Sequence, residues 1–260
     1  MRQNVPILVY HHVYKDSFLE SINTKHDSAT GMIKESEFRL HLNYIMENNW
    51  SVISTNQLSD WIEGEVEIPE KSVVLHFDNG WLDTFTIAMP IVRELGITAT
   101  CYVISDATEA ASKGLDANIR TSTEGSVKKR CIDWKQTNLL LEMGWEIGAH
   151  TATHPKLVDL LNEHGEEGVM LEIEKSNKSY LDNLGFIPRH FAYPSGSNNI
   201  HTDRLLGDVY QTLRLWEFNN PPTWSFTNGK TSSHGLKSQN LDSTVSFSDF
   251  VRIFHESEVL

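Results

Sequence analysis

The sequence predicts an α/β fold, a distorted barrel in which strands and helices alternate around a mostly parallel sheet. Short apolar runs alternate with helical segments along most of the chain, which is the pattern of repeated β-α-β units. The chain has 260 residues, of which 39% are hydrophobic, and this suits one barrel with a full core. Polar residues with catalytic chemistry directly follow several of the apolar runs. We therefore expect a single domain over residues 1–260.

The first half of the chain alternates regularly between the two kinds of element. Helices are predicted where apolar residues recur at helical spacing, as Phe38, Leu42 and Ile45 do, and Gly96 is a typical helix end. The predicted strands cover residues 5–10, 50–53, 72–77 and 98–104. The predicted helices cover residues 37–48, 56–63 and 84–95.

The second half is less regular. Residues 105–130 are polar and rich in Ser, Thr, Gly and Lys, so we expect a long surface loop that forms a lid or rim. Further helices are expected at 133–143, 169–184 and 247–257. Further strands are expected at 145–148 and 189–193. The segment between 197 and 246 shows no clear pattern.

Charge and composition exclude several kinds of partner. Asp and Glu number 35 against 22 Lys and Arg, a formal net charge of −13. Nucleic acid is not expected, because neutralising phosphates requires clustered cations, whereas a neutral or cationic glycan is compatible with an acidic surface. No apolar run reaches eighteen residues, so we expect no transmembrane segment. Residues 1–4 lead straight into a predicted strand, and we expect no signal peptide in this sequence.

Four polar residues stand immediately after predicted strands: His11, Asp78, His150 and Ser195. In a barrel of this type the carboxyl ends of the strands form one face, where active sites collect. We therefore expect these side chains to meet in one pocket.

The pattern His-Thr-Ala-Thr-His at 150–154 is a candidate metal site. Two histidines four residues apart can close around one cation, and imidazole is a good ligand for zinc and related ions. With 12 histidines in the chain, a chance surface pair is the alternative. The strand before His150 and the proline after His154 favour the metal site, since they fix the entry and exit of the loop.

Asp78 and Asn79 end the apolar strand at 72–77 and are the next candidates. Consecutive residues at a strand end point in different directions, so one can face a metal while the other faces a reacting water. An oxygen ligand beside two histidines, with positions left open for water, is a usual catalytic arrangement. The alternative is an ordinary turn, because Asn-Gly is a strong turn dipeptide.

Ser195 and His11 are weaker candidates on local sequence alone. The Pro-Ser-Gly turn at 194–196 can aim a backbone N–H at a developing oxyanion, although the same residues are typical of any turn. His11 directly follows the first predicted strand, and a single histidine there is more often held by a structural hydrogen bond than used in catalysis.

In their order and context, these segments resemble the NodB-type polysaccharide deacetylases, carbohydrate esterase family 4. The family's Thr-Phe-Asp-Asp-Gly stands here as His-Phe-Asp-Asn-Gly at 76–80. Its Glu-Ile-Gly-Ser and His-Thr-x-x-His-Pro stand as Glu-Ile-Gly-Ala-His-Thr-Ala-Thr-His-Pro at 146–155. Its Phe-x-x-Pro-Tyr-Gly turn stands as Phe-Ala-Tyr-Pro-Ser-Gly at 191–196. The opening Tyr-His-His at 10–12 is similar to the branch that acts on the poly-N-acetylglucosamine of biofilms.

The resemblance implies a distorted (β/α) barrel of the NodB-homology type and a metal-dependent amide hydrolase. It assigns a divalent metal to Asn79, His150 and His154, with zinc as the first choice and cobalt or nickel as alternatives. The implied substrate is an N-acetylated polysaccharide or oligosaccharide, which would release acetate. The family suggests an extracellular or cell-envelope location.

The resemblance also assigns the catalytic roles. Asp78 would be the general base that takes a proton from water. His11 would protonate the leaving amine, a role that a late histidine has in other members of the family. The backbone N–H of Ser195 would share the oxyanion.

Four positions depart from the family pattern. Asn79 replaces an aspartate ligand, which should weaken metal binding by at least the roughly 10–100-fold typical of changes around the ligands. Ala192 stands where many members have an arginine that pairs with the base, and Ser195 replaces a tyrosine. His76 replaces a threonine, and would either add a ligand or fill the barrel.

Asn79 leaves several readings open. The position can be natural and active, natural and degenerate, or an introduced substitution; a degenerate site would make this a carbohydrate-binding homologue. A deacylase of a small N-acyl substrate on the same fold is a further alternative, since fold does not fix substrate. Trp81, Tyr193 and Trp216 are candidates for lining a sugar groove, although large aromatic residues more often pack in cores.

Overall fold

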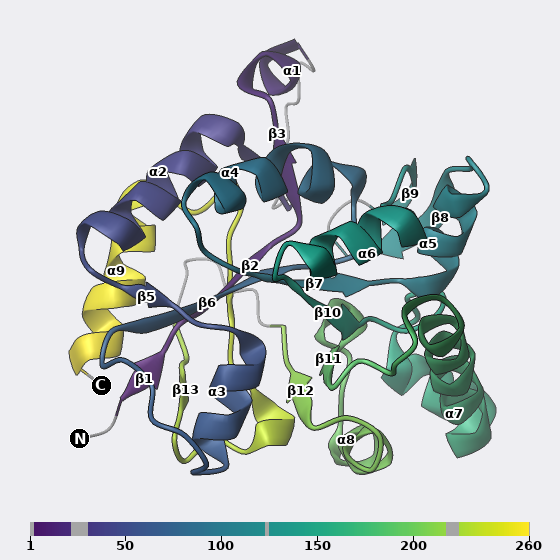
Figure 1. Ribbon diagram of the computed structural model, residues 1–260. Helices are drawn as coiled ribbons and strands as arrows, with labels where there is room; N and C mark the ends of the chain where they lie inside the picture. Colours follow the sequence, from purple (N-terminus) through teal and green to yellow (C-terminus); the bar gives the residue numbers. More distant parts are fainter. Residues whose placement is uncertain (1–2, 22–30, 123–124, 217–223, 260) are drawn as a thin grey trace.

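The computed structural model describes residues 3–21, 31–122, 125–216 and 224–259. Within these residues, eight strands form one curved sheet, and helices cover its outer face (Figure 1). The strand pairings within this sheet are all parallel among the described residues, so the carboxyl ends of its strands share one edge. The predicted α/β class and the barrel-like, mostly parallel sheet are confirmed.

The strands of the curved sheet follow one another in an order that differs from the order in sequence. Along the sheet they are β12 (Thr212–Arg214), β11 (His190–Ala192), β10 (Glu146–Ala149), β7 (Thr100–Val103), β6 (Ser72–Phe77), β2 (Ile7–Tyr10) and β14 (Gln239–Asn240), with β5 (Ser51–Val52) paired to β6. Three short pairs lie outside it: β1 (Asn4–Val5) with β13 (Thr227–Asn228), β3 (His12–Tyr14) with β4 (Met32–Lys34), and β8 (Ala117–Thr121) with β9 (Gly125–Lys129).

The helices alternate with the strands for most of the chain. They are α1 (Asp16–Ser21), α2 (Glu35–Glu47), α3 (Thr55–Ile62), a π-helical turn (Thr84–Ala88) continued by α4 (Met89–Glu94), α5 (Ser105–Ser112), α6 (Trp134–Glu142), α7 (Leu157–Leu184), α8 (Ile200–Gly207) and α9 (Phe247–Val259). Short 3-10 turns lie at Pro194–Gly196 and Ser233–Gly235.

The central strand β6 shows how the sheet separates two environments. Its side chains alternate between faces, as in any strand. Leu75 and Phe77 join the main core between the sheet and the helices. Val74 joins a smaller apolar cluster with Ile7. His76 lies on the same inner face, one step closer to the carboxyl end, so the barrel interior becomes polar toward that end.

The prediction of a long loop at 105–130 is wrong. This stretch forms α5 and the antiparallel hairpin of β8 and β9. Ala107 and Ala111 of α5 pack against Ala117 and Ile119, which alternate with exposed residues along β8. Small alanines and a single alternating isoleucine form this unit, so its apolar signal in the sequence is weak.

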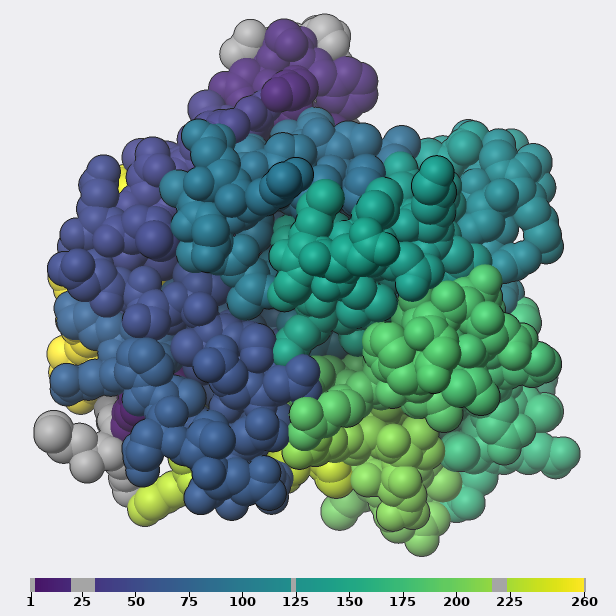
Figure 2. All heavy atoms as spheres, in the orientation of Figure 1, coloured from purple at the N-terminus to yellow at the C-terminus, as the bar shows by residue number. Residues whose placement is uncertain are grey.

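The predicted helix at 169–184 begins earlier, at Leu157, and contains a break at Gly165, whose φ of 68° is left-handed. No helix or strand was predicted for α1, β3 and β4, and of these α1 protrudes from one side of the barrel (Figures 1 and 2). No helix in the described segments has the length and apolar character required to cross a membrane.

We expect α9 to be an integral part of the core. The Phe250 ring is fully buried and stacks on His41 at a centroid distance of 3.8 Å. Phe250→Ala should therefore lower the free energy of unfolding by about 3–5 kcal/mol. Phe247→Ala on the same helix is the matched control, and should cost much less because Phe247 is 39% exposed. Urea unfolding measures both, and equal losses would contradict this packing.

Candidate active site

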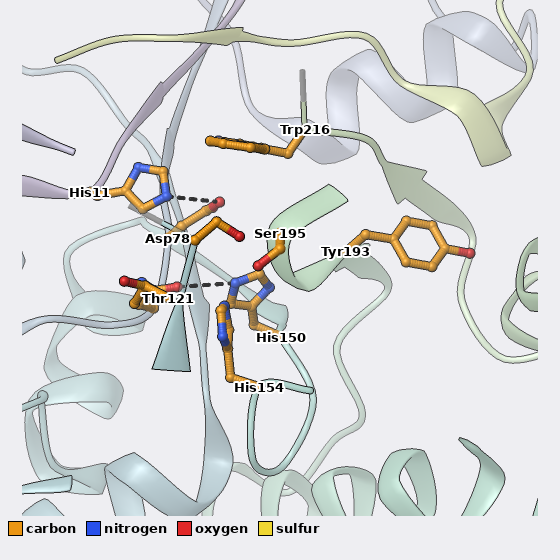
Figure 3. A pocket seen from close by; sticks show the side chains of 10 residues that line it. His11, Asp78, Thr121, His150, His154, Tyr193, Ser195 and Trp216 are labelled. Atoms are coloured by element: carbon orange, nitrogen blue, oxygen red, sulfur yellow. Dashed lines mark hydrogen bonds and ion pairs between the residues drawn. The ribbon is translucent and has the colours of Figure 1, made fainter. Parts of the chain in front are cut away.

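All six sequence-predicted site residues lie in one pocket at the carboxyl ends of the strands (Figure 3). Each follows or links strands that the parallel sheet places side by side, which is why distant parts of the chain meet here. The lining residues are His11, Asp78, Asn79, Thr121, Ser122, His150, His154, Tyr193, Ser195 and Trp216. Two of them, Thr121 and Ser122, belong to the hairpin of β8 and β9, so the stretch at 105–130 borders the pocket.

The loops that carry the site have unusual backbone conformations. Asn79, Thr151, His154 and Ser195 have left-handed φ values of 71°, 65°, 65° and 55°. Such conformations cost free energy in residues other than glycine, and they often occur at functional sites. Among the described residues, the one other non-glycine residue with a positive φ is Asn49, far along the chain from any site residue.

Asp78 is held by an ion pair with Arg214. One guanidinium nitrogen of Arg214, Nη2, donates to both carboxylate oxygens of Asp78, at 2.7 and 2.6 Å. Both side chains are buried, and Arg214 is fully so. Burial is the largest single influence and raises the pKa of Asp78, but the charge and hydrogen bond of Arg214, together with His150 and His11, outweigh it, and the pKa falls to about 2. Asp78 is therefore a carboxylate at neutral pH, as a general base must be.

Arg214 was not predicted as a site residue from the sequence. Ala192 stands where many members of the polysaccharide deacetylases that the motifs resemble have the arginine that pairs with the base. The structure supplies the guanidinium from the end of β12, one strand further along the sheet. The available signal was an arginine inside the apolar run Thr-Leu-Arg-Leu-Trp at 212–216, where a charged side chain needs a buried partner.

Asn79 and His150 present lone pairs to the same point. His150 Nδ1 lies 2.7 Å from the carbonyl oxygen of Ala192, which can only accept, so Nδ1 carries the proton. Nε2 of His150 is then an acceptor, and it lies 3.1 Å from the amide oxygen Oδ1 of Asn79. Two acceptors this close repel one another unless a cation or proton lies between them.

His154 completes the set in the same way. Its Nδ1–H donates a hydrogen bond to the carbonyl oxygen of Arg120 at 2.8 Å. The other ring nitrogen, Nε2, therefore carries the lone pair that could bind a metal. Burial lowers the pKa of His150 to about 3 and that of His154 to about 4, so both rings are neutral at physiological pH. Neutral imidazoles oriented by backbone carbonyls are the usual form of histidine metal ligands.

These residues fit a divalent metal with an unusually neutral donor set. Within the described segments, no three side chains from His, Cys, Asp and Glu converge in a metal-binding group. The third position here belongs to the amide of Asn79, which offers an oxygen but no charge. Asn79, His150 and His154 would hold the ion.

His11 lies beside Asp78 in the pocket. Its Nε2 is 3.9 Å from the Asp78 carboxylate. Burial lowers the pKa of His11, an effect that the negative charge of Asp78 partly offsets. His11 is thus placed to exchange a proton with a group bound beside Asp78.

Ser195 lies in a turn that approaches the chain after β12 very closely. The turn is closed by the Gly196 N–H, which donates to Tyr193 O at 3.1 Å. A β-carbon on Gly196 would meet the carbonyl oxygen of Trp216 at 2.3 Å, so this position requires glycine. The close approach places Trp216 over the pocket that Ser195 lines (Figure 3).

The three aromatic candidates separate clearly. Trp81 is 1% exposed and stacks on His12, so it packs in the structure outside the pocket. Tyr193 points its hydroxyl away from the pocket centre, where it donates to Asp203 at 2.7 Å (Figure 3). Trp216 is half-buried and faces the pocket, so of the three it is the one positioned to contact a ligand.

His76 is not among the residues that line the pocket. Its Nε2 lies 2.9 Å from the hydroxyl of Thr55, deep in the barrel. Of the two possibilities left open for this position, an added ligand or a residue that fills the barrel, the geometry favours the second.

The model of one protein family, polysaccharide deacetylase, matches residues 65–211 of this chain. The chain belongs to the polysaccharide deacetylase family. This agrees with the resemblance in the motifs, and it makes the protein a member of a family of hydrolases. The matched region contains Asp78, Asn79, His150, His154 and Ser195, whereas His11 and Arg214 lie outside it.

Individual polysaccharide deacetylase relatives are distant. YxkH of Bacillus subtilis, whose name places it in the same family, is 21% identical over 198 residues, which are 76% of this chain and 59% of YxkH. A de-N-acetylase from Aggregatibacter actinomycetemcomitans has a TM-score of 0.77 at 18% identity, covering 96% of this chain and 99% of its own. IcaB from Ammonifex degensii has a TM-score of 0.72 at 18% identity, covering 98% and 97%. At this identity the structures support the fold.

The ion pair gives a prediction on stability. Arg214→Met would leave the buried Asp78 carboxylate unpaired, which should cost about 3–5 kcal/mol of unfolding free energy at pH 7. Asp78→Asn added to Arg214→Met should recover most of that loss, because a neutral amide needs no counter-charge. Urea unfolding of the three proteins measures this.

Acid should remove the same contribution. In the folded protein the pKa of Asp78 is about 2, below the value of about 3.9 for a free aspartate. The contribution of the ionised carboxylate to stability is therefore complete above about pH 3.9, and it is lost as the pH falls toward 2. An Arg214→Met variant as stable as the parent at pH 7 would contradict the pairing.

Proposed function

We propose that this polysaccharide deacetylase homologue hydrolyses N-acetyl groups of an N-acetylhexosamine polysaccharide, in a metal-dependent reaction that releases acetate. The observation that carries the proposal is the juxtaposition of a buried, ionised Asp78 with two acceptors, Asn79 Oδ1 and His150 Nε2, only 3.1 Å apart. Hydrolysis of an amide by a metal-activated water requires a general base next to the atoms that bind the metal.

Each residue of the site has a role in this proposal. Asp78, oriented by Arg214, removes a proton from the attacking water. His11, once protonated, gives a proton to the leaving nitrogen as the amide C–N bond breaks. The Ser195 backbone N–H faces the oxygen of the former carbonyl and stabilises its developing charge. Trp216 covers the pocket and limits the access of further water.

A divalent metal, zinc as the first choice and cobalt or nickel as alternatives, would supply Lewis-acid polarisation of the acetamide carbonyl when bound. The backbone orients the two histidines for this role, since the carbonyls of Ala192 and Arg120 fix the rings of His150 and His154. Poly-N-acetylglucosamine is the first substrate to test, because the Tyr-His-His opening at 10–12 resembles that branch.

Acetate release tests the proposal directly. We expect acetate from poly-N-acetylglucosamine in the presence of zinc, loss of that activity after dialysis against a chelator, and its return with metal. Asp78→Asn should lower kcat by about 10²–10⁴-fold, the contribution typical of a general base. Chito-oligomers, peptidoglycan and small N-acetylated amines belong in the same assay. Release from the small amines alone would favour a small-molecule deacylase.

Asn79 also supports a second candidate, a carbohydrate-binding homologue that has lost catalysis. Asn79→Asp separates the two. A carboxylate should raise zinc affinity by about 10-fold or more, because it adds a negative charge to a neutral donor set. Asn118→Asp, which adds the same charge at an exposed position of β8, should leave the affinity unchanged.

Competition with a chelating dye measures zinc affinity, and acetate release reports activity. Stoichiometric zinc and measurable acetate in the parent contradict the binding-only candidate. Activity that is present in Asn79→Asp and absent in the parent contradicts the deacetylase proposal for this sequence.

A further inference from the structure

A column of buried side chains lies directly beneath the base. The Arg214 guanidinium carbon lies 5.1 Å from the centre of the Tyr102 ring, within the range of a cation–π contact. The ring of His76 meets the Tyr102 ring edge-on, with centroids 4.9 Å apart and an interplanar angle of 67°. All three side chains are fully buried.

The Tyr102 ring is fixed by contacts with its faces and edge. Gly148 lies against it so closely that a β-carbon there would be 2.3 Å from Cδ1 of the ring. The Tyr102 hydroxyl has no partner in ordinary hydrogen-bond geometry among the described residues, although the Thr55 side chain lies close enough to lower its pKa against the larger effect of burial. The faces and edge of the ring therefore make the main contacts that hold this residue in place, to Arg214, His76 and Gly148.

The support continues below His76. Its Nε2 contacts the hydroxyl of Thr55 at 2.9 Å, and that hydroxyl contacts Thr100 at 2.6 Å. Thr100 donates to a carboxylate oxygen of Glu146 at 3.0 Å, and Glu146 accepts the first backbone N–H groups of α3. The column is thus anchored at the opposite end of the barrel, which limits the freedom of the His76 ring.

Arg214 has few other contacts that would fix its plane. Nη2 gives both of its bonds to Asp78, and Nη1 makes one long contact, 3.5 Å, with the carbonyl of Leu215. Nε makes no hydrogen bond within the described part of the chain. The orientation of the guanidinium therefore depends on the surface beneath it.

We propose that Tyr102 is a positioning residue for the catalytic base, whose ring holds the Arg214 guanidinium in the plane that orients Asp78, and that His76 supports this ring. This rests on the proposed function, in which Asp78 is the base. It also gives His76, the departure from the family threonine, a part in the reaction that needs no contact with substrate or metal. A tilt of the guanidinium would turn the carboxylate, and misplacement by about 1 Å can cost about 10²-fold in rate.

Tyr102→Leu and Tyr102→Phe test the inference in the full-length, zinc-loaded protein. Leu removes the aromatic surface, so kcat for acetate release should fall by about 10–100-fold, while KM and zinc affinity stay within about twofold of the parent. Phe keeps the ring, so its kcat should stay within about twofold. Tyr210→Leu, which removes a different buried tyrosine ring, controls for general loss of packing and should retain kcat.

The outcomes that overturn the inference are specific. They are a parental kcat in Tyr102→Leu, an equal loss in Tyr102→Phe, an equal loss in Tyr210→Leu, or a fall in zinc affinity that matches the fall in kcat. A parent that releases no acetate from any glycan would instead contradict the proposed function, and this inference with it.

His76→Thr is the second variant, for the case in which Tyr102→Leu does not fold. It restores the family residue and removes the edge contact to the ring. We expect kcat to fall by several-fold with zinc affinity unchanged, since the ring loses support but remains present. An unchanged kcat in a folded His76→Thr protein would overturn the role of His76 in holding the ring.

Discussion

The buried ion pair between Asp78 and Arg214 constrains the rest of the structure. The two residues follow β6 and end β12, and three strands, β7, β10 and β11, separate these along the sheet. In a flat sheet, four strand spacings of about 4.8 Å would hold the backbones roughly 19 Å apart. Nitrogen and carboxylate nevertheless meet at 2.6 Å. The sheet must therefore curl so that β12 faces β6 across the interior, and the pair reports that curvature.

Curling also explains the polar interior. A narrow barrel closed by large apolar side chains would leave no room for a guanidinium below the base. Here the absence of a side chain at Gly148 makes space for the Tyr102 ring, and the Arg214 guanidinium packs against the face of this ring. Because Arg214 already neutralises Asp78, and because Asn79, His150 and His154 are uncharged, the side chains of the site have nearly balanced charge. In the proposed function, the charge that Asn79 lacks would therefore affect metal affinity and not folding.

The sequence predicted those features that local periodicity or strand-end position determines. Because they follow parallel strands, His11, Asp78, His150 and Ser195 were predicted to lie on one face of the barrel, and the pocket contains all four. Prediction failed where the signal in the sequence was weak or depended on residues far apart. The hairpin of β8 and β9 has only Ala117 and Ile119 facing inward, too few for a recognisable alternation. Arg214 was missed because its partner is 136 residues away, and only the curled sheet brings the two together.

The site is larger than the family match that identifies it. Residues 65–211 contain Asp78 and the three candidate ligands, but Arg214, which pairs with Asp78, lies three residues beyond that region, and His11 lies well before it. The segments outside the match are joined to the barrel by backbone pairing, β2 with β6 and β12 with β11. Since an ionised carboxylate buried without Arg214 would be strongly destabilised, the matched region alone does not contain a self-sufficient site. The Asp78–Arg214 pair depends on the complete barrel, a fold that IcaB and the de-N-acetylase share over 98% and 96% of this chain.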